Sequence, residues 1–323
     1  MTKPRILVTR RWPEAVEARM AEVFDLDLNG TDTPLGEADL RDAMGKYDAI
    51  LPTVTDRLPA AVFDRPSART RILANYGVGF AHIDTEAAKS RGITVTNTPD
   101  VLSECTADIA MTLMLMVARR AGDGERELRE GRWSGWRPTH LIGTKVSGAT
   151  LGIIGFGRIG QAMAQRAHFG FGMKIIVQNR SPVPADVLAR YGAVQVPAID
   201  DLLPLCDFVS LHCPGGATNR HLINSRRLDL MRPGAFLINT ARGEVVDEHA
   251  LAQALWFGTI GGAGLDVFER EPHVPAELLG ADNLVMLPHL GSATRETREA
   301  MGFRVLDNLM DFFDGKTPRD RVA

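Results

Sequence analysis

The stretch Leu151-Gly-Ile-Ile-Gly-Phe-Gly-Arg-Ile-Gly160 decides the fold of this chain. Its apolar first half predicts a buried strand, its glycines have the spacing G-x-G-x-x-G, and residues 161–169 predict a helix. In such a turn the first glycine permits a tight bend, the second lets backbone approach a pyrophosphate, and the third allows close helix–strand packing. A second predicted strand follows at residues 173–178. The stretch therefore predicts a dinucleotide site, with phosphates at the helix N-terminus.

Composition narrows the class of protein. The 323 residues suffice for about two domains, and a net charge of −3 gives no basic field, so we expect no nucleic-acid partner. The apolar stretch 101–118 contains Glu104 and Asp108, which favours a buried or interface helix over a membrane span. The N-terminus lacks an apolar signal core. We expect a cytoplasmic protein without disulfides or a metal site, because the sparse cysteines lack ligand spacing: Cys105, Cys206 and Cys213.

Predicted strands and helices alternate along the whole chain, which indicates an α/β protein with parallel sheets. The first part, through residue 96, contains short apolar strands separated by amphipathic helices. The last predicted helix, 295–313, stops before Asp314-Gly315. In the second part we predict strands near residues 151–154, 174–178, 194–196, 208–212, 235–239, 262–265 and 284–287.

Three polar segments follow apolar strands of the second part, where ligands of doubly wound sheets bind. They contain Arg242, Asp266 with Glu271, and His289. An arginine, a carboxylate and a histidine at strand ends can bind an anion and relay a proton. Each residue taken alone is more typical of an ordinary position: a surface ion pair, a solvated carboxylate or a satisfied loop histidine.

The whole chain resembles the D-isomer-specific 2-hydroxyacid dehydrogenases, most closely the glyoxylate/hydroxypyruvate reductase branch. The separations between Arg242, Glu271 and His289 fit the family's Arg–Glu–His arrangement without insertions. The matching motifs cover nearly the full length: 75–80, 97–99, 131–136, 151–160, 212–214, 239–243, 264–272 and 288–291.

The resemblance implies a catalytic role for each member of this triplet. Arg242 would bind the substrate carboxylate and polarise its keto oxygen, and His289 would give that oxygen a proton. Glu271 would hydrogen-bond the imidazole and favour its charged form. The backbone N–H groups of Val78 and Gly79 would cradle the carboxylate. The implied reaction is NAD(P)H-dependent reduction of small 2-keto acids, glyoxylate and hydroxypyruvate, to D-2-hydroxy acids.

The resemblance also implies the cofactor contacts. Asp266 would hold the nicotinamide carboxamide, and Thr106 would touch the phosphates or the nicotinamide side. The remaining expected contacts are Gly155, Gly157, Arg158, Ile159, Gly160, Cys213, Pro214 and Thr240.

The end of the second predicted strand favours NADPH over NADH. An NAD-specific site places a carboxylate there, whereas this chain has Asn179, Arg180 and Ser181, and its next carboxylate is Asp186. Arg180 can pair with a 2′-phosphate, to which Asn179 and Ser181 can add hydrogen bonds. If Arg180 is only a solvated loop residue, the enzyme accepts both coenzymes.

The family's domain order implies a Rossmann cofactor domain, residues 100–290, inserted in a discontinuous flavodoxin-like substrate domain, residues 1–99 plus 291–323. The catalytic cleft would lie between them, with hinges at Pro99 and after Leu290. We also expect a homodimer, because the helix 101–118 is apolar almost all round and Trp133 and Trp136 follow it. One tryptophan would then border the partner's active site; the alternative is that both fill their own domain's core.

Two rival functions remain open on the sequence. Larger 2-keto acids such as 2-ketogluconate are compatible with the same motifs, because the sequence does not size the pocket. A non-catalytic, NAD(H)-sensing scaffold could retain Arg242, Glu271 and His289, although the chain shows neither a long disordered tail nor a basic face.

Overall fold

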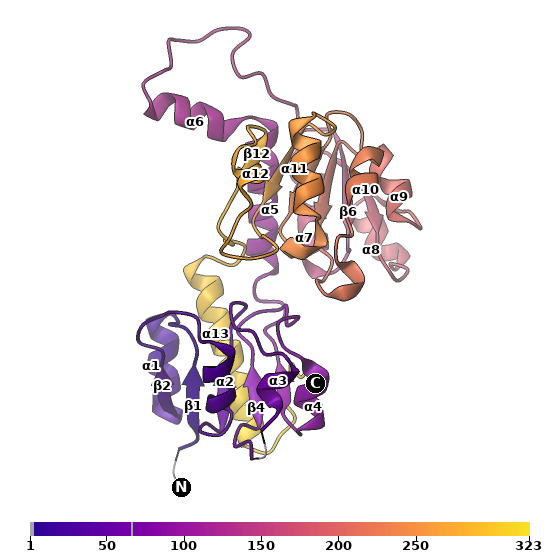
Figure 1. Ribbon diagram of the computed structural model, residues 1–323. Coiled ribbons are helices and arrows are strands. Elements are labelled where there is room, and N and C mark those ends of the chain that lie inside the picture. Colours follow the sequence, from indigo (N-terminus) through magenta and orange to yellow (C-terminus); the bar gives the residue numbers. More distant parts are fainter. Residues whose placement is uncertain (1–2, 66) are drawn as a thin grey trace. The chain divides into compact units, whose positions relative to one another are not determined.

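The computed structural model describes residues 3–65 and 67–323, which divide into two compact α/β units. Unit 1 comprises the described residues up to Leu102 together with Ala293–Ala323, and unit 2 is Ser103–Ser292. Figure 1 follows the chain through both units by colour, with the yellow C-terminal helix α13 among the indigo and violet elements of unit 1.

Unit 1 is built on a five-stranded, all-parallel sheet of order β2-β1-β3-β4-β5, which is the flavodoxin-like order. Its strands are short, and all except the edge strand β2 are largely buried because helices cover the sheet. The strands are β1 (Arg5–Val8), β2 (Asp25–Leu28), β3 (Ala49–Leu51), β4 (Ile72–Ala74) and β5 (Thr94–Thr96). The helices are α1 (Glu14–Val23), α2 (Glu37–Ala43), α3 (Ala60–Phe63), α4 (Thr85–Ser90) and α13 (Arg295–Phe313).

The C-terminal segment is an integral part of unit 1. The Val95 N–H donates to the carbonyl of Ala323 at 3.0 Å, and Val322 N–H donates to the carbonyl of Val95 at 2.8 Å. Helix α13 packs on α1 so closely that a Cβ at Gly302 would lie 2.5 Å from Cγ1 of Val16. Residues far apart in the sequence therefore form one core.

Unit 2 is built on a seven-stranded parallel sheet of order β12-β11-β10-β9-β6-β7-β8, a Rossmann order with one added strand. All seven strands predicted from the sequence are confirmed, each to within one residue. They are β6 (Thr150–Ile154), β7 (Lys174–Gln178), β8 (Ala193–Gln195), β9 (Phe208–Leu211), β10 (Phe236–Asn239), β11 (Gly262–Leu265) and β12 (Leu284–Met286). The helices are α5 (Ser103–Ala118), α6 (Ala121–Arg129), α7 (Arg158–Gln165), α8 (Ala185–Arg190), α9 (Ile199–Leu202), α10 (Ser225–Leu230), α11 (Glu248–Trp256) and α12 (Ala276–Leu279).

Two helices of unit 2 differ from the prediction. The helix expected at 161–169 begins at Arg158, directly after Gly157, and continues beyond Gln165 as the π-helix Arg166–Gly170. Helix α5 packs against β10, β11 and α7, so its apolar surface is largely used inside unit 2. Its apolar character therefore does not require a partner subunit. None of the helices in the described residues combines the length and apolarity that a membrane crossing needs.

The close approach of α1 and α13 predicts whether replacing Gly302 by alanine stabilises or destabilises the protein. Gly→Ala within a helix normally stabilises by up to ~1 kcal/mol, whereas overpacking a core costs about 1–3 kcal/mol. We expect Gly302→Ala to lower the free energy of unfolding by about 1 kcal/mol, measured by chemical denaturation. Gly122→Ala on α6, where the nearest atom to the new Cβ is Nη1 of Arg126 at 3.5 Å, should cause no loss. A Gly302→Ala protein as stable as the parent would contradict this packing.

Candidate active site

The glycine turn after β6 has the geometry that its sequence predicts. Gly155 has φ +92°, and a Cβ there would lie 2.7 Å from the backbone N of Cys213. A Cβ on Gly160 would overlap the carbonyl oxygen of Gly155, so only glycine lets α7 pack this close to the strand. Gly157, at the N-terminus of α7, faces open space, because a Cβ there would have no neighbouring atom within 4 Å. The first N–H groups of this helix lack helical acceptors and can bind an anion.

Two buried polar atoms beside this turn fit a polar ligand. Nδ1 of His212, after β9, and Oγ1 of Thr240, after β10, are buried and have no hydrogen-bond partner within the described residues. The other ring nitrogen of His212 lies 2.9 Å from Oγ of Ser210. Burial lowers the pKa of His212 to about 4, so its ring is neutral at physiological pH. Burial also raises the pKa of the adjacent Cys213 thiol to about 11, so this group is not a thiolate. Pro214, which completes the segment, accepts a hydrogen bond from Asn219 at its carbonyl.

The loop after β7 presents a free arginine. Oδ1 of Asn179 accepts the N–H of Phe156 at 3.1 Å, and Nδ2 of Asn179 donates to the carbonyl of Ser181 at 3.0 Å. Asn179 therefore ties this loop to the glycine turn. Arg180 between them is exposed and forms no hydrogen bond or ion pair with any residue that the structure describes.

Arg242 follows β10 in a loop that is fixed by the last residue of that strand. Nδ2 of Asn239 donates to the carbonyl of Arg242 at 2.9 Å, and Oδ1 of Asn239 accepts from Ala241 N–H at 3.0 Å. The guanidinium of Arg242 donates to the carbonyl of Ala241 at 2.7 Å. Burial lowers the pKa of Arg242, and the nearby carboxylates of Glu271 and Glu244 oppose that effect. Arg242 thus remains a desolvated cation whose remaining donors can bind an anion.

Glu271 and His289 form a hydrogen-bonded pair. Nδ1 of His289 lies 2.7 Å from Oε2 of Glu271, whose other oxygen accepts the N–H of Phe268 at 3.0 Å. Burial opposes ionisation of Glu271, but the hydrogen bond and charge of His289 prevail and lower the pKa of this carboxyl. The His289 and Glu271 side chains remain 31% and 30% exposed, so substrate can reach the imidazole. His289 has φ +57°, a strained conformation for a non-glycine residue.

Asp266 fixes the loop that carries His289. Its two carboxylate oxygens accept the N–H groups of Leu290 at 2.6 Å and Gly291 at 2.7 Å. Its backbone carbonyl accepts the N–H of His289 at 2.9 Å. Burial raises the pKa of Asp266, an effect that these two N–H groups oppose. Oγ1 of Thr106 donates to the carbonyl of Gly291 at 3.2 Å, so α5 also supports this loop.

The structure therefore assembles Arg242, Glu271 and His289 from the carboxyl ends of the three neighbouring strands β10, β11 and β12. A half-buried guanidinium, close enough to Glu271 to interact with its charge, together with an imidazole held by that carboxylate, can bind an anionic substrate and move a proton.

The loop after β4, in unit 1, is organised separately. Nδ2 of Asn75 donates to the carbonyls of Gly77 and Gly79 at 2.9 and 3.1 Å, and Nδ2 of Asn97 donates to that of Val78 at 2.9 Å. In a trans peptide the following N–H points away from its carbonyl. The N–H of Val78 therefore points away from Asn75, and the N–H of Gly79 points away from Asn97. They have no acceptor among the described residues, so they can bind an anion.

Sequence reasoning missed the side chains that fix these loops: Asn75, Asn97 and Asn239. His82 supports Asn75 in turn, with its Nε2 3.0 Å from Oδ1 of Asn75. Each asparagine stands at the end of, or directly after, a strand, and that placement is the signal that could have identified them.

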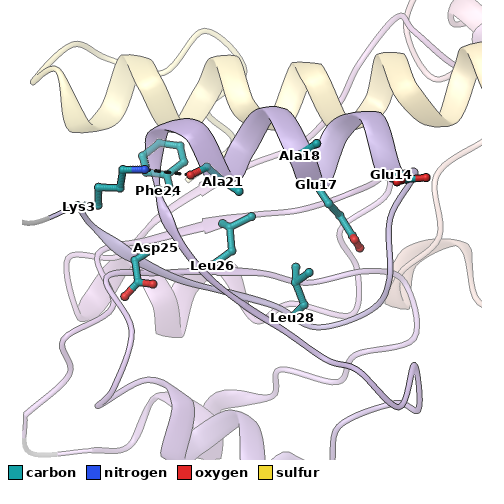
Figure 2. A pocket seen from close by; sticks show the side chains of 9 residues that line it. All are labelled: Lys3, Glu14, Glu17, Ala18, Ala21, Phe24, Asp25, Leu26 and Leu28. Atoms are coloured by element: carbon teal, nitrogen blue, oxygen red, sulfur yellow. Dashed lines mark hydrogen bonds between the residues drawn. The ribbon is translucent and has the colours of Figure 1, made fainter.

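A groove elsewhere in unit 1, between α1 and the edge strand β2, lacks such chemistry (Figure 2). Lys3 at one end donates to the carbonyl of Ala21 at 3.0 Å. Glu17 is engaged by Arg11 and by the N–H of Trp12. Its remaining polar side chains are the carboxylates Glu14 and Asp25, and no histidine or arginine is among the described residues that line it, so the groove is not the candidate active site.

Comparison with known proteins identifies the same regions. Residues 111–291 match the family model described as D-isomer specific 2-hydroxyacid dehydrogenase, NAD binding domain. The glyoxylate reductase of Thermococcus onnurineus is 43% identical over 320 residues, which cover 98% of this chain and 95% of that protein. The glycerate dehydrogenase of Hyphomicrobium methylovorum is 38% identical, with 98% of each chain covered.

Solved structures agree over the full length. The NADPH-dependent glyoxylate/hydroxypyruvate reductase of Sinorhizobium meliloti, in complex with NADP and malonate, has a TM-score of 0.89 and 38% identity. The match covers 100% of this chain and 97% of that one.

Proposed function

This chain belongs to the D-isomer specific 2-hydroxyacid dehydrogenase family of oxidoreductases, and we propose that it reduces glyoxylate and hydroxypyruvate to D-2-hydroxy acids. The observation that carries the proposal is the 2.7 Å pair of His289 and Glu271, which shares its strand-end edge with the half-buried Arg242. The similarity of the chain to glyoxylate reductases and to a glycerate dehydrogenase supports small 2-keto acids as substrates. When bound in unit 2, a nicotinamide coenzyme supplies the hydride.

The chain's own residues would bind and orient the keto acid. The N–H groups of Val78 and Gly79 bind its carboxylate, because both lack other acceptors in the described structure. Arg242 provides further donors to the carboxylate and polarises the keto oxygen. The rigid loop around Asn239 fixes the guanidinium, so binding requires little reorganisation.

The pair of His289 and Glu271 would supply the proton. Nδ1 of His289 faces Glu271, which leaves Nε2 as the atom that donates to the keto oxygen. The negative charge of Glu271 stabilises the imidazolium before transfer, and its lowered pKa keeps the carboxylate ionised at neutral pH. In the oxidation direction Nε2 takes the proton back.

We assign the cofactor to unit 2. Its phosphates would bind the N–H groups of Gly157, Ile159 and Gly160, with Arg158 beside them. The unpartnered Thr240 hydroxyl and His212 ring nitrogen, with Cys213 and Pro214, would line the rest of that site. We also propose a cytoplasmic location, because no disulfide links any of the three cysteines in the described structure.

The catalytic assignment predicts distinct kinetic effects. His289→Ala should lower kcat for glyoxylate reduction by about 10²–10⁴-fold, because the general acid is lost. Arg242→Ala should mainly lower kcat/KM, because substrate binding and carbonyl polarisation both weaken. The measurement is the loss of coenzyme absorbance in steady state, with circular dichroism as the folding control. A folded His289→Ala protein with near-native turnover would contradict the role of His289. If the parent enzyme reduced larger 2-keto acids faster than glyoxylate and hydroxypyruvate, the substrate would have to be reassigned.

We propose that NADPH is the preferred coenzyme. The exposed Arg180 has no partner in the described structure, and the segment 179–181 contains no carboxylate that would repel a 2′-phosphate. A charge-assisted hydrogen bond of this kind readily supplies the ~1.4 kcal/mol that corresponds to a tenfold preference. The Sinorhizobium meliloti relative, whose structure contains NADP, is consistent with the proposal.

The coenzyme proposal predicts a selective effect of Arg180→Ala. We expect kcat/KM for NADPH to exceed that for NADH by about tenfold in the parent, and the ratio to fall towards one in the variant. Arg190→Ala, which removes another exposed arginine of unit 2, is the matched control and should leave the ratio unchanged. Equal parent values, or a ratio that Arg180→Ala does not alter, would refute the role of Arg180.

We propose a homodimer formed through α6 and the loop that follows it, which Figure 1 shows leaving the body of unit 2. Helix α6 contributes no buried residue to its own unit. Trp133 and Trp136 are 51% and 82% exposed, so the alternative that both fill their own core is wrong. Exposed tryptophans of this kind are typical of interfaces, and one of them would border the partner's active site.

The dimer proposal predicts a doubled mass in solution. Light scattering at micromolar concentration should give about twice the 35.2 kDa of one chain. Trp133→Ser combined with Trp136→Ser should shift the protein to monomer, because both aromatic anchors are lost. Trp256→Ser, which removes a tryptophan that is 64% exposed on α11, should leave the dimer intact. A parent protein that is monomeric under these conditions would rule the proposal out.

A further inference from the structure

The turn that carries Glu271 is held by a second glutamate, Glu248. Oε1 of Glu248 accepts the N–H of Glu269 at 2.7 Å, while Glu271 itself accepts the N–H of Phe268 at 3.0 Å. Two consecutive N–H groups of the turn are thus fixed by two carboxylates. Glu248 is the first residue of α11 and is only 8% exposed.

The burial of Glu248 is not explained by helix α11 alone. Asp247 already caps this helix, with its side chain accepting the N–H of Ala250 at 3.1 Å. An acidic residue in the first turn interacts favourably with the helix dipole even when it is exposed, whereas burying a carboxylate costs free energy. Burial of Glu248 places its carboxylate where it accepts the hydrogen bond from the turn.

The same turn is also confined by Gly243. A Cβ at this position would overlap the backbone of Phe268 and Glu269, so the segment after Arg242 lies directly against the turn. Glu248 and Gly243 together limit where the turn can lie, and the turn determines where Glu271 presents its carboxylate to His289.

The charged groups around the turn also have partners. Glu269 pairs with Arg220 and with His221, whose other ring nitrogen lies 3.8 Å from Asp247. Arg270, Glu269 and Glu271 all act electrostatically on Glu248. Glu248 therefore belongs to a polar cluster that joins α11 to the turn.

We propose that Glu248 is a positioning residue for the reaction: by fixing the turn Phe268–Glu271, it keeps Glu271 against His289. This inference rests on the proposed function of that pair. Glu248 touches neither substrate nor coenzyme and acts only through Glu271.

Two substitutions separate positioning from charge. Glu248→Gln keeps an oxygen acceptor for the Glu269 N–H and should retain kcat to within about threefold. Glu248→Asp keeps the charge but is one methylene shorter, so it should lower kcat by about 10–100-fold, the range that a misplaced catalytic group costs. KM for glyoxylate should change little, because Asn239 holds Arg242 independently. His249→Ala, at the exposed next position of α11, is the matched control and should match the parent.

The pH profile supplies a readout that a merely structural role would not move. Reduction needs a proton on His289, and an imidazolium that loses its carboxylate partner holds that proton less firmly. In Glu248→Asp, kcat/KM should therefore begin to fall at lower pH than in the parent, while Glu248→Gln follows the parent profile. A folded Glu248→Asp protein with parent-like kcat and profile would overturn the inference.

A second measurement distinguishes failure of this inference from failure of the proposed function. The imidazole signals of His289 can be followed by NMR across neutral pH without any substrate. We expect these signals to shift in Glu248→Asp, because the imidazole loses its carboxylate partner, and to be restored in Glu248→Gln. If the parent reduces no 2-keto acid but this shift occurs, the proposed function fails and the positioning role stands; if no shift occurs, the positioning role is wrong whatever the activity.

Discussion

The carboxylate of Asp266 is the interaction on which the arrangement of the candidate site depends. It is almost completely buried, and a buried carboxylate is tolerated only when hydrogen bonds replace its lost hydration. The N–H groups of Leu290 and Gly291 provide that replacement, and in doing so they fix the strained backbone of His289. The N–H of Asp266 itself donates to the carbonyl of Asn239 at 3.0 Å, which links this anchor to the loop of Arg242.

A parallel sheet explains why three such anchors lie together. The carboxyl ends of neighbouring parallel strands meet at one edge, so the loops after β10, β11 and β12 are adjacent whatever their separation in sequence. A buried polar side chain fixes each loop: Asn239 holds the loop after β10, Glu248 the loop after β11, and Asp266 the loop after β12. The reacting side chains can stay partly exposed because these buried residues hydrogen-bond the backbone of the loops that carry them.

The sequence was informative where one local rule determines the outcome. Strands of a covered parallel sheet are continuous apolar runs, so β6 to β12 could be placed to within one residue. The tight turn expected at Gly155 and the close helix–strand packing expected at Gly160 are both present in the structure. The roles of Arg242, Glu271 and His289 came from family resemblance. Spacing alone does not reveal which carbonyl Asn75 or Asn97 will reach, because that depends on how distant strands pair. The apolar surface of α5 likewise does not say whether its own sheet or a partner covers it.

The discontinuity of unit 1 has a consequence for the order in which the protein folds during synthesis. Unit 2 is continuous in sequence, so all of its strands are available before α13 has been made. Helix α1 must wait for α13, because Val16 packs against Gly302 near the other end of the chain. At ~5–20 residues per second, that wait lasts on the order of ten seconds or longer. During this interval the part of the α1 surface that α13 will cover has no partner, so this apolar surface stays exposed on the nascent chain.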